Sequence, residues 1–274
     1  MATIDYASKY SPLVDERFSI ASMTDQAFNQ DYDFTGVATV NVYSVGTAPM
    51  NDYVMTGANR YGTPDELGAT KQALTLTQDR SFTFTIDKRN YTDTQMVTES
   101  GKALNRQLTE VTIPEVDKYR ISKLVAGAGT TTTVTAITNT NAYSSFLTGV
   151  ATLLDNKVPM PGTFAFISTE FYKAIRLDGS FIKASDMAQN MLVTGQVGMV
   201  ENVPLIYVPT AYLPTGISFL ITNRIAAVAP QKIAEFKVND TPQGISGWLA
   251  EGRIYHDAFV LGNKKKAIYA HKSA

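Results

Sequence analysis

The sequence contains no cysteine, two histidines and one tryptophan in 274 residues. Without cysteine, the chain forms no disulfide bond and no thiolate metal site. The histidines, His256 and His271, lie in strand-like sequence with no spaced set of carboxylates beside them, so we interpret both as half-buried or surface side chains. We predict no metal site and no cofactor. The single tryptophan, Trp248, is interpreted as part of a core.

Motifs for catalysis and phosphate binding are also missing. The sequence has no G-x-S-x-G, no G-x-G-x-x-G and no P-loop. Gly127 and Gly129 follow a helical pattern instead of preceding one, which is the wrong order for a phosphate-binding turn. We predict no catalytic residues and therefore no enzyme. An α/β enzyme with a β-rich appendage is an alternative that a pocket of convergent carboxylates would support.

Charge is scarce and nearly balanced. Charged residues make up 18% of the sequence, below the usual level of about 25%, and the net charge is −1. No field of one sign attracts nucleic acid or anionic lipid, and neither a signal peptide nor a membrane-spanning run is present. We predict no membrane contact. The one basic run, Lys264 to Lys266, is interpreted as a solvated hairpin turn, with DNA or an acidic neighbour as the alternative partner.

The region 36–87 has the pattern of antiparallel strands in its outer parts. Residues 37–45, 73–77 and 81–87 read as strands. Apolar residues alternate with polar ones, with Ala38, Val40 and Val42 opposite Thr39, Asn41 and Tyr43, and with Phe82, Phe84 and Ile86 opposite Thr83 and Thr85. We find no segment of the chain that obviously covers these strands.

The middle of this region is a long loop between residues 46 and 71. Its glycines and prolines exclude a helix, while its tyrosines and methionines argue against disorder. We interpret it as an arm that orders against a second copy of the chain, with Gly36 and Gly46 as hinges. The predicted contact residues are Met50, Tyr53, Met55, Arg60, Tyr61, Asp65 and Glu66, with Asp15 and Arg17 of the N-terminal arm as charge partners. Asp25, Asp31 and Asp33 are further candidate charge partners.

The most helical part of the sequence follows the arm. Apolar residues between 94 and 111 recur at spacings of three and four, which predicts a long amphipathic helix with its N-cap at residue 92 or 93. Pro114 is expected to interrupt this helix. Thr112 and Glu115 form a T-x-x-E capping box, so a second helix is predicted from residue 113 to Gly127.

The remaining sequence alternates helices and strands. A helix is predicted around residues 143–154, and another is capped at Ser168 and runs to residue 177. Predicted strands cover residues 130–138, 163–168, 203–209, 217–222, 224–230, 232–238, 247–262 and 266–271. The last three strands are expected to return to the long helix, and a turn is expected at residues 262–263.

The order of these elements resembles the major capsid proteins of tailed bacteriophages, which have the α+β Hong Kong 97-type fold. The resemblance lies in residues 92–125, 156–175, 180–209 and 252–271 and in the order of the elements around them. It implies an N-terminal arm (1–35), an extended loop (36–87), a peripheral domain (88–140 with 231–274) and an axial domain (141–230).

The resemblance also implies a function. Such a chain would assemble with itself into the pentamers and hexamers of an icosahedral virion shell around double-stranded DNA, after assembly in the host cytoplasm, with only weak non-specific contact to that DNA. A separate scaffolding protein is expected because the arm begins within 35 residues of Met1, and portal and decoration or head-completion proteins would be further partners. An encapsulin-type nanocompartment is the alternative with the same fold.

Overall fold

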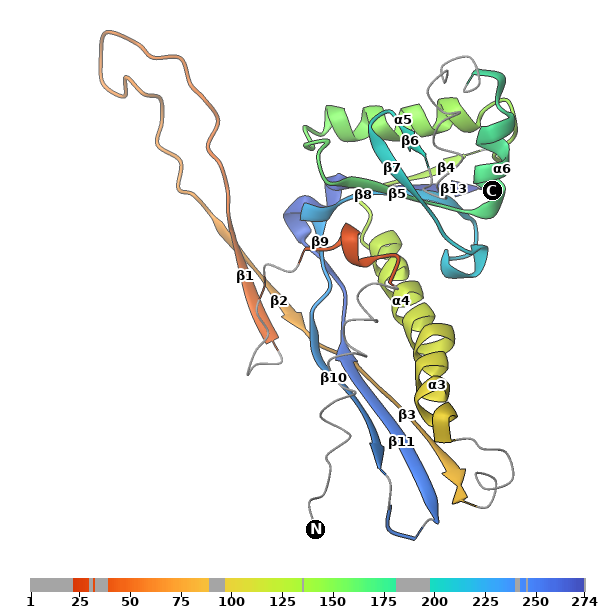
Figure 1. Ribbon diagram of the computed structural model, residues 1–274. Helices are drawn as coiled ribbons and strands as arrows, with labels where there is room; N and C mark the ends of the chain where they lie inside the picture. The colour runs from red at the N-terminus through yellow and green to blue at the C-terminus, as the bar shows by residue number, and fades with distance from the viewer. Residues whose placement is uncertain are drawn as a thin grey trace.

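The computed structural model describes residues 22–29, 32, 39–88, 97–134, 136–180, 198–239, 242–244 and 246–273. It consists of a projecting two-stranded hairpin, a long helix on a three-stranded sheet, and a six-stranded sheet with helices (Figure 1). Helices and mainly antiparallel strands are segregated, so the predicted α+β class is confirmed.

The hairpin consists of β1 (Thr39–Val45) and β2 (Ala69–Thr75). The two strands are antiparallel, with Val45 opposite Ala69 at the outer end of the stem. Burial alternates along β1, where Val40 and Val42 are half-buried and their neighbours are exposed. The predicted alternation is therefore confirmed in the described part of the strand.

The three-stranded sheet has the order β10–β11–β3. Its strands are β3 (Gln78–Asp87), β10 (Gln231–Asn239) and β11 (Gly247–His256). The long helix lies along one face of this sheet (Figure 1). Their shared core consists of Leu104, Leu108, Ile113, Val116, Phe236 and Ile254, with Phe82 and Phe84 packed against it. The predicted inward positions of Phe82 and Phe84 are confirmed.

The long helix is continuous, so the predicted break at Pro114 is wrong. It comprises α3 (Val97–Gln107), one π-helical turn η2 (Leu108–Thr112) and α4 (Ile113–Ala126). Thr112 has helical φ and ψ of −70° and −50° and makes no capping hydrogen bond. The wider turn shifts the hydrogen-bond register ahead of Pro114, which accommodates a residue with no N–H group. The expected N-cap at residues 92–93 lies outside the described residues.

The six-stranded sheet has the order β4–β13–β8–β5–β7–β6. Its strands are β4 (Thr130–Val134), β5 (Thr163–Ile167), β6 (Met199–Val200), β7 (Val203–Tyr207), β8 (Ile217–Asn223) and β13 (Ile268–Ser273). The helices α5 (Ala142–Asp155) and α6 (Thr169–Leu177) pack against it. The Ser168 side chain accepts a hydrogen bond from the Phe171 N–H, which confirms the predicted cap.

The strand pairing differs from the expectation that residues 266–271 return to the long helix. β13 pairs with β4 on one side and with β8 on the other, so it lies inside the six-stranded sheet. Every residue from Ile268 to His271 is buried there. An alternating strand pattern does not identify the sheet that a strand joins, because that pairing is set by residues far away in the sequence, here in β8 and β4.

Three shorter predictions also need correction. Only Ala227–Val228 (β9) of residues 224–230 is a strand, because the Asn223 side chain accepts from the Ile225 N–H and starts a 3-10 turn, η5 (Arg224–Ala226). The expected long strand 247–262 breaks after β11 and resumes as β12 (Phe259–Val260), which pairs with β9. In place of a hairpin turn, a 3-10 helix η6 (Gly262–Ala267) holds the exposed lysines of the basic run. Two further short turns are η1 (Asp25–Ala27) and η4 (Thr210–Tyr212).

Gly129, between the long helix and β4, is required by close backbone packing. A Cβ atom there would lie 2.4 Å from the Lys265 carbonyl oxygen. We expect Gly129→Ala to lower the free energy of unfolding by about 1–3 kcal/mol because backbone atoms must shift, as measured by urea denaturation. The control is Gly68→Ala, whose Cβ meets no atom within 4 Å. Equal stability of the two variants would contradict this explanation.

Candidate assembly interface

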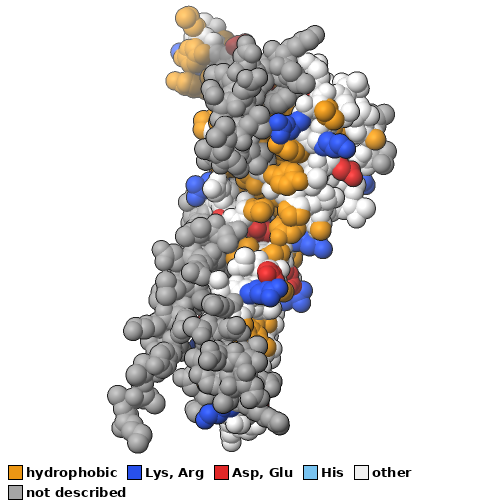
Figure 2. All heavy atoms as spheres, turned by 45° about the vertical axis from the view of Figure 1, so that its right-hand side comes forward, with side chains coloured by type: hydrophobic (Ala, Val, Ile, Leu, Met, Phe, Trp, Pro, Cys, Tyr) orange, Lys and Arg blue, Asp and Glu red, His pale blue; other side chains and the backbone are white. Residues whose placement is uncertain are grey.

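The hairpin tip, residues 46–68, carries an unusual amount of exposed apolar surface. Among the described residues, eight of the fourteen exposed large hydrophobic side chains lie between Tyr43 and Leu67. Met50 is 99% exposed, Tyr61 83% and Met55 81%. Figure 2 shows hydrophobic side chains gathered at the top of the view, where the tip lies. A surface of this kind is typical of a protein interface.

The tip has internal structure despite its exposure. The Val54 N–H donates to the Arg60 carbonyl at 3.0 Å, and the rings of Tyr53 and Tyr61 meet edge to face with centroids 5.1 Å apart. The Arg60 Nε donates to the Gly57 carbonyl at 3.2 Å, and Gly57 has a φ of 93°. The turn therefore presents two tyrosines and an arginine together, a combination that is enriched at interface hot spots.

The base of the hairpin packs on its own chain, which corrects the expectation that the region has no cover. Leu74 and Leu76 are buried in a cluster with Val228 and Leu261. The Gln72 side chain donates to the Val260 carbonyl at 3.0 Å and accepts from the Gly262 N–H at 2.8 Å. On the outer stem, the Asn263 side chain still donates to the Ser44 hydroxyl. The exposed faces of the outer stem and the tip are left for a partner.

Two buried charged residues on α4 hold the segment before the hairpin. Asp117, 1% exposed, accepts hydrogen bonds from the side chains of Ser22 and Thr24, both at 2.6 Å, and from the Met23 N–H at 3.0 Å. Arg120 pairs with Asp25 and lies 5.7 Å from the centroid of the Phe28 ring. These contacts fix residues 22–28 against the long helix.

Comparison with known proteins finds similarity in structure but not in sequence. No family profile and no curated protein matches the chain. A solved structure from Mycobacterium phage Che8 matches with a TM-score of 0.71 and 17% identity, covering 91% of this chain and 90% of that one. A chain from the capsid structure of the cyanophage P-SCSP1u matches with a TM-score of 0.67 and 12% identity, covering 90% and 86%. The chain has the fold of bacteriophage capsid proteins.

The predicted Hong Kong 97-type capsid fold is thereby confirmed over about nine-tenths of the chain. A virus-like particle from Pyrococcus furiosus shares it with a TM-score of 0.60 and 8% identity, covering 98% of this chain and all of that one. Identities this low show the fold alone. Within the described residues, no helix is long and apolar enough to cross a membrane.

The capsid fold places most of the predicted contact residues together. Met50, Tyr53, Met55, Arg60 and Tyr61 all lie on the exposed tip, and Asp65 and Glu66 are exposed on its return limb. Asp15, Arg17, Asp31 and Asp33 lie outside the described residues. Whether the tip residues contact a second copy stays a prediction.

Three predicted roles change in the structure. Asp25 pairs with Arg120 of its own chain, so it is not a free charge partner for a neighbour. The Gly46 N–H donates to the Gly68 carbonyl at 3.0 Å, so Gly46 extends the stem ladder by one bond. The other predicted hinge, Gly36, lies outside the described residues, and Trp248 is half-buried, not part of a core.

Both histidines are buried, in contrast to the expected half-buried or surface positions. His256 is 4% exposed, and burial lowers its pKa to about 4. The positive charges of Arg120 and Arg80 lower this pKa further, while the negative charge of Asp257 raises it. His271 is 1% exposed, and burial lowers its pKa as well. Its ring stacks on Phe219 at a centroid distance of 4.7 Å. Both side chains are therefore neutral near pH 7.

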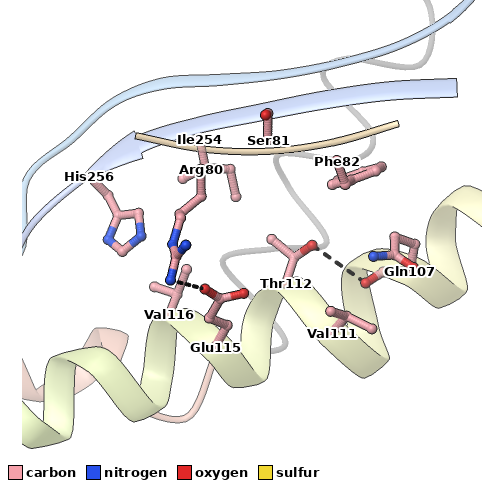
Figure 3. Close-up of a pocket in the computed structure, with 10 residues that line it drawn as sticks. All are labelled: Arg80, Ser81, Phe82, Gln107, Val111, Thr112, Glu115, Val116, Ile254 and His256. Atoms are coloured by element: carbon pink, nitrogen blue, oxygen red, sulfur yellow. Dashed lines mark hydrogen bonds and ion pairs between the residues drawn. The ribbon is translucent and has the colours of Figure 1, made fainter. Parts of the chain in front are cut away.

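A pocket of about 140 Å³ lies between the π-helical turn and β3 (Figure 3). Its walls include Phe82, Val111 and His256, and Arg80 of β3 pairs with Glu115 of α4 at 3.0 Å across its edge. Glu115 thus has a structural ion pair and not the predicted capping role. Nowhere in the described ranges do three or more histidine, aspartate or glutamate side chains form a group able to hold a metal ion.

Sequence reasoning missed the two residues that anchor residues 22–28 to the long helix. Asp117 and Arg120 lie on the same face of α4 as the buried Ile113, Val116 and Ile121. Charged residues that the helical period places among buried apolar residues can be recognised in the sequence. They indicate contact with a partner group, because charged side chains are almost never buried without partners.

Proposed function

We propose that this chain is the major capsid protein of a tailed bacteriophage, which assembles with itself into pentamers and hexamers of an icosahedral shell around double-stranded DNA. The observation that carries the proposal is the hairpin, whose exposed apolar tip projects from the body (Figure 1). An isolated two-stranded hairpin is marginally stable in water, so a partner surface would complete it. The shared capsid fold supports a second copy of the chain as that partner.

Such a shell needs no strong single contact. A contact of about −4 kcal/mol corresponds to millimolar affinity, and several such contacts per subunit produce a stable closed assembly through multivalency. Rotation-related contacts that close into rings are required. A hairpin that reaches beyond its own subunit is suited to make them.

The proposed partners follow from the same assembly. They are further copies of the chain, a separate scaffolding protein, a portal, and decoration or head-completion proteins, first in the host cytoplasm and then in the virion. Packaged DNA would make only weak non-specific contact, because the net charge is −1. The exposed lysines 264–266 on η6 are the most basic surface that the sequence offers for it.

The alternative with the same fold is an encapsulin-type nanocompartment, which would enclose a protein cargo. An α/β enzyme is disfavoured because the solved structures that share this fold include bacteriophage capsid structures. We therefore propose a structural, non-enzymatic role.

Expression followed by electron microscopy tests the proposal. The chain is produced with and without a candidate scaffolding protein, and the high-molecular-weight fraction is imaged. We expect closed icosahedral shells, with a more uniform diameter when the scaffold is present. Particles that enclose an enzyme would instead support the nanocompartment, and a monomer that forms no particle under either condition would contradict both.

A further inference from the structure

We propose that Asp257 sets the direction in which the hairpin leaves the body of the subunit. The inference rests on the proposed function, in which the hairpin makes the contact with a neighbouring subunit. Asp257 would be a positioning residue, since it acts through the hairpin and not on the neighbour itself.

Asp257 is a buried carboxylate with all of its acceptor positions in use. It is 1% exposed and lies between the end of β11 and the start of β12. Its Oδ2 accepts from the Thr77 N–H at 2.8 Å and from the Thr77 hydroxyl at 2.7 Å. Its Oδ1 accepts from the Tyr119 hydroxyl at 2.7 Å and from the Ala258 N–H at 2.8 Å. We call these four residues the Asp257 junction.

The junction lies at the pivot of the hairpin. Thr77 belongs to the two-residue link between β2, which is part of the hairpin, and β3, which is part of the body. β3 is fixed up to this link because Gln78 pairs with His256 of β11. The direction of β2 relative to β3 therefore depends on the backbone of Leu76 and Thr77.

The junction connects this pivot to a rigid element. Tyr119 lies on α4, so its hydroxyl ties the carboxylate, and through it Thr77, to the long helix. Lys123, one turn further along α4, lies 5.2 Å from the centroid of the Tyr119 ring. The hairpin, the helix and the end of β11 thus meet at a single side chain.

Hydrogen bonds to a carboxylate are suited to set an angle. The apolar cluster of Leu74, Leu76, Val228 and Leu261 also holds the base, but hydrophobic contact is non-directional and tolerates rotation. Hydrogen bonds to an ionised acceptor are short, strong and directional. The cluster therefore keeps the hairpin attached. The two hydrogen bonds of Gln72 hold β2 further out, while the Asp257 junction sets the direction at the pivot itself.

Spin-label distances in the soluble full-length subunit test this role. Since the chain contains no cysteine, Thr70→Cys on the outer stem and Lys118→Cys on α4, both at exposed positions, would be the only labelled sites. Double electron–electron resonance then measures the distribution of distances between stem and helix. We expect one narrow distribution in the otherwise unchanged chain.

Two conservative variants remove one link each. Thr77→Val deletes the hydroxyl but keeps the N–H, and Tyr119→Phe deletes the bond between the helix and the carboxylate. We expect each to raise the fraction of displaced stems about tenfold, the factor expected for one hydrogen bond to a charged group. In the double variant, the fraction of displaced stems should rise by less than the product of the two single increases, because both substitutions act through one carboxylate.

The matched control is Tyr143→Phe, which removes a 2.8 Å hydrogen bond to Glu201 far from the pivot. Unchanged distances in both junction variants, or an equal change in the control, would overturn the role of Asp257. Shell formation is scored separately by electron microscopy. A displaced stem with normal shells would support the positioning role and contradict the proposed use of the hairpin in assembly.

Discussion

Replacement of residues 47–67 by an Asn-Gly turn is expected to leave a folded subunit that forms no shells. The stem can be closed in this way because the Gly46 N–H already donates to the Gly68 carbonyl, and a two-residue Asn-Gly loop suits an antiparallel hairpin. Of the residues removed, only Gly62 is even half-buried, and the rest are exposed. The free energy of unfolding should therefore change by less than about 0.5 kcal/mol.

The loss of assembly follows from what the deletion removes. Six of the exposed large hydrophobic side chains, from Met50 to Leu67, disappear with the tip. Thermal unfolding and electron microscopy measure the two effects on the same preparation. The control is Thr63→Ser, which removes one exposed methyl group and should assemble normally. Normal shells from the truncated chain would rule out the tip as an interface.

The second large effect is a loss of stability in acid. The folded subunit holds His256 neutral with a pKa of about 4, whereas the unfolded chain protonates near pH 6.5. Since the unfolded state binds the extra proton, stability is complete above about pH 6.5 and falls as the pH drops toward 4. The shift corresponds to about 3 kcal/mol for His256, and the lowered pKa of His271 acts in the same direction.

Substitution of His271 isolates its share of this effect. Neither ring nitrogen of His271 has a hydrogen-bond partner, and the ring stacks on Phe219, so His271→Phe should be tolerated at pH 7.5. Urea unfolding at pH 7.5 and pH 5 should then show that the free energy of unfolding falls less between the two pH values in the variant than in the parent chain. Equal losses in the two proteins would mean that folding does not lower the pKa of His271.

Local patterns in the sequence predicted most of the individual elements. The alternation of Val40 and Val42, the cap at Ser168 and the apolar spacing of α5 each depend on neighbours only a few residues away. The exposed tip residues were also predictable, because glycines and prolines exclude regular structure and the apolar residues among them have no local cover.

Features that depend on distant residues were not predictable. The position of β13 is decided by its pairing with β4 and β8. The burial of His271 follows from that pairing, since Phe219 of β8 covers its ring. Likewise, Asp257 reads as an ordinary polar residue in a strand until Thr77 and Tyr119 are brought to it.

The continuity of β2 and β3 has a mechanical consequence. Only residues 76 and 77 separate the hairpin from β3, which pairs with β11 along all ten of its residues. A pull on the tip along the direction of β3 would load the hydrogen bonds of this ladder in shear, all at once, instead of opening them one at a time from an end. In the proposed shell, internal pressure would therefore meet resistance from a whole strand pair in each subunit.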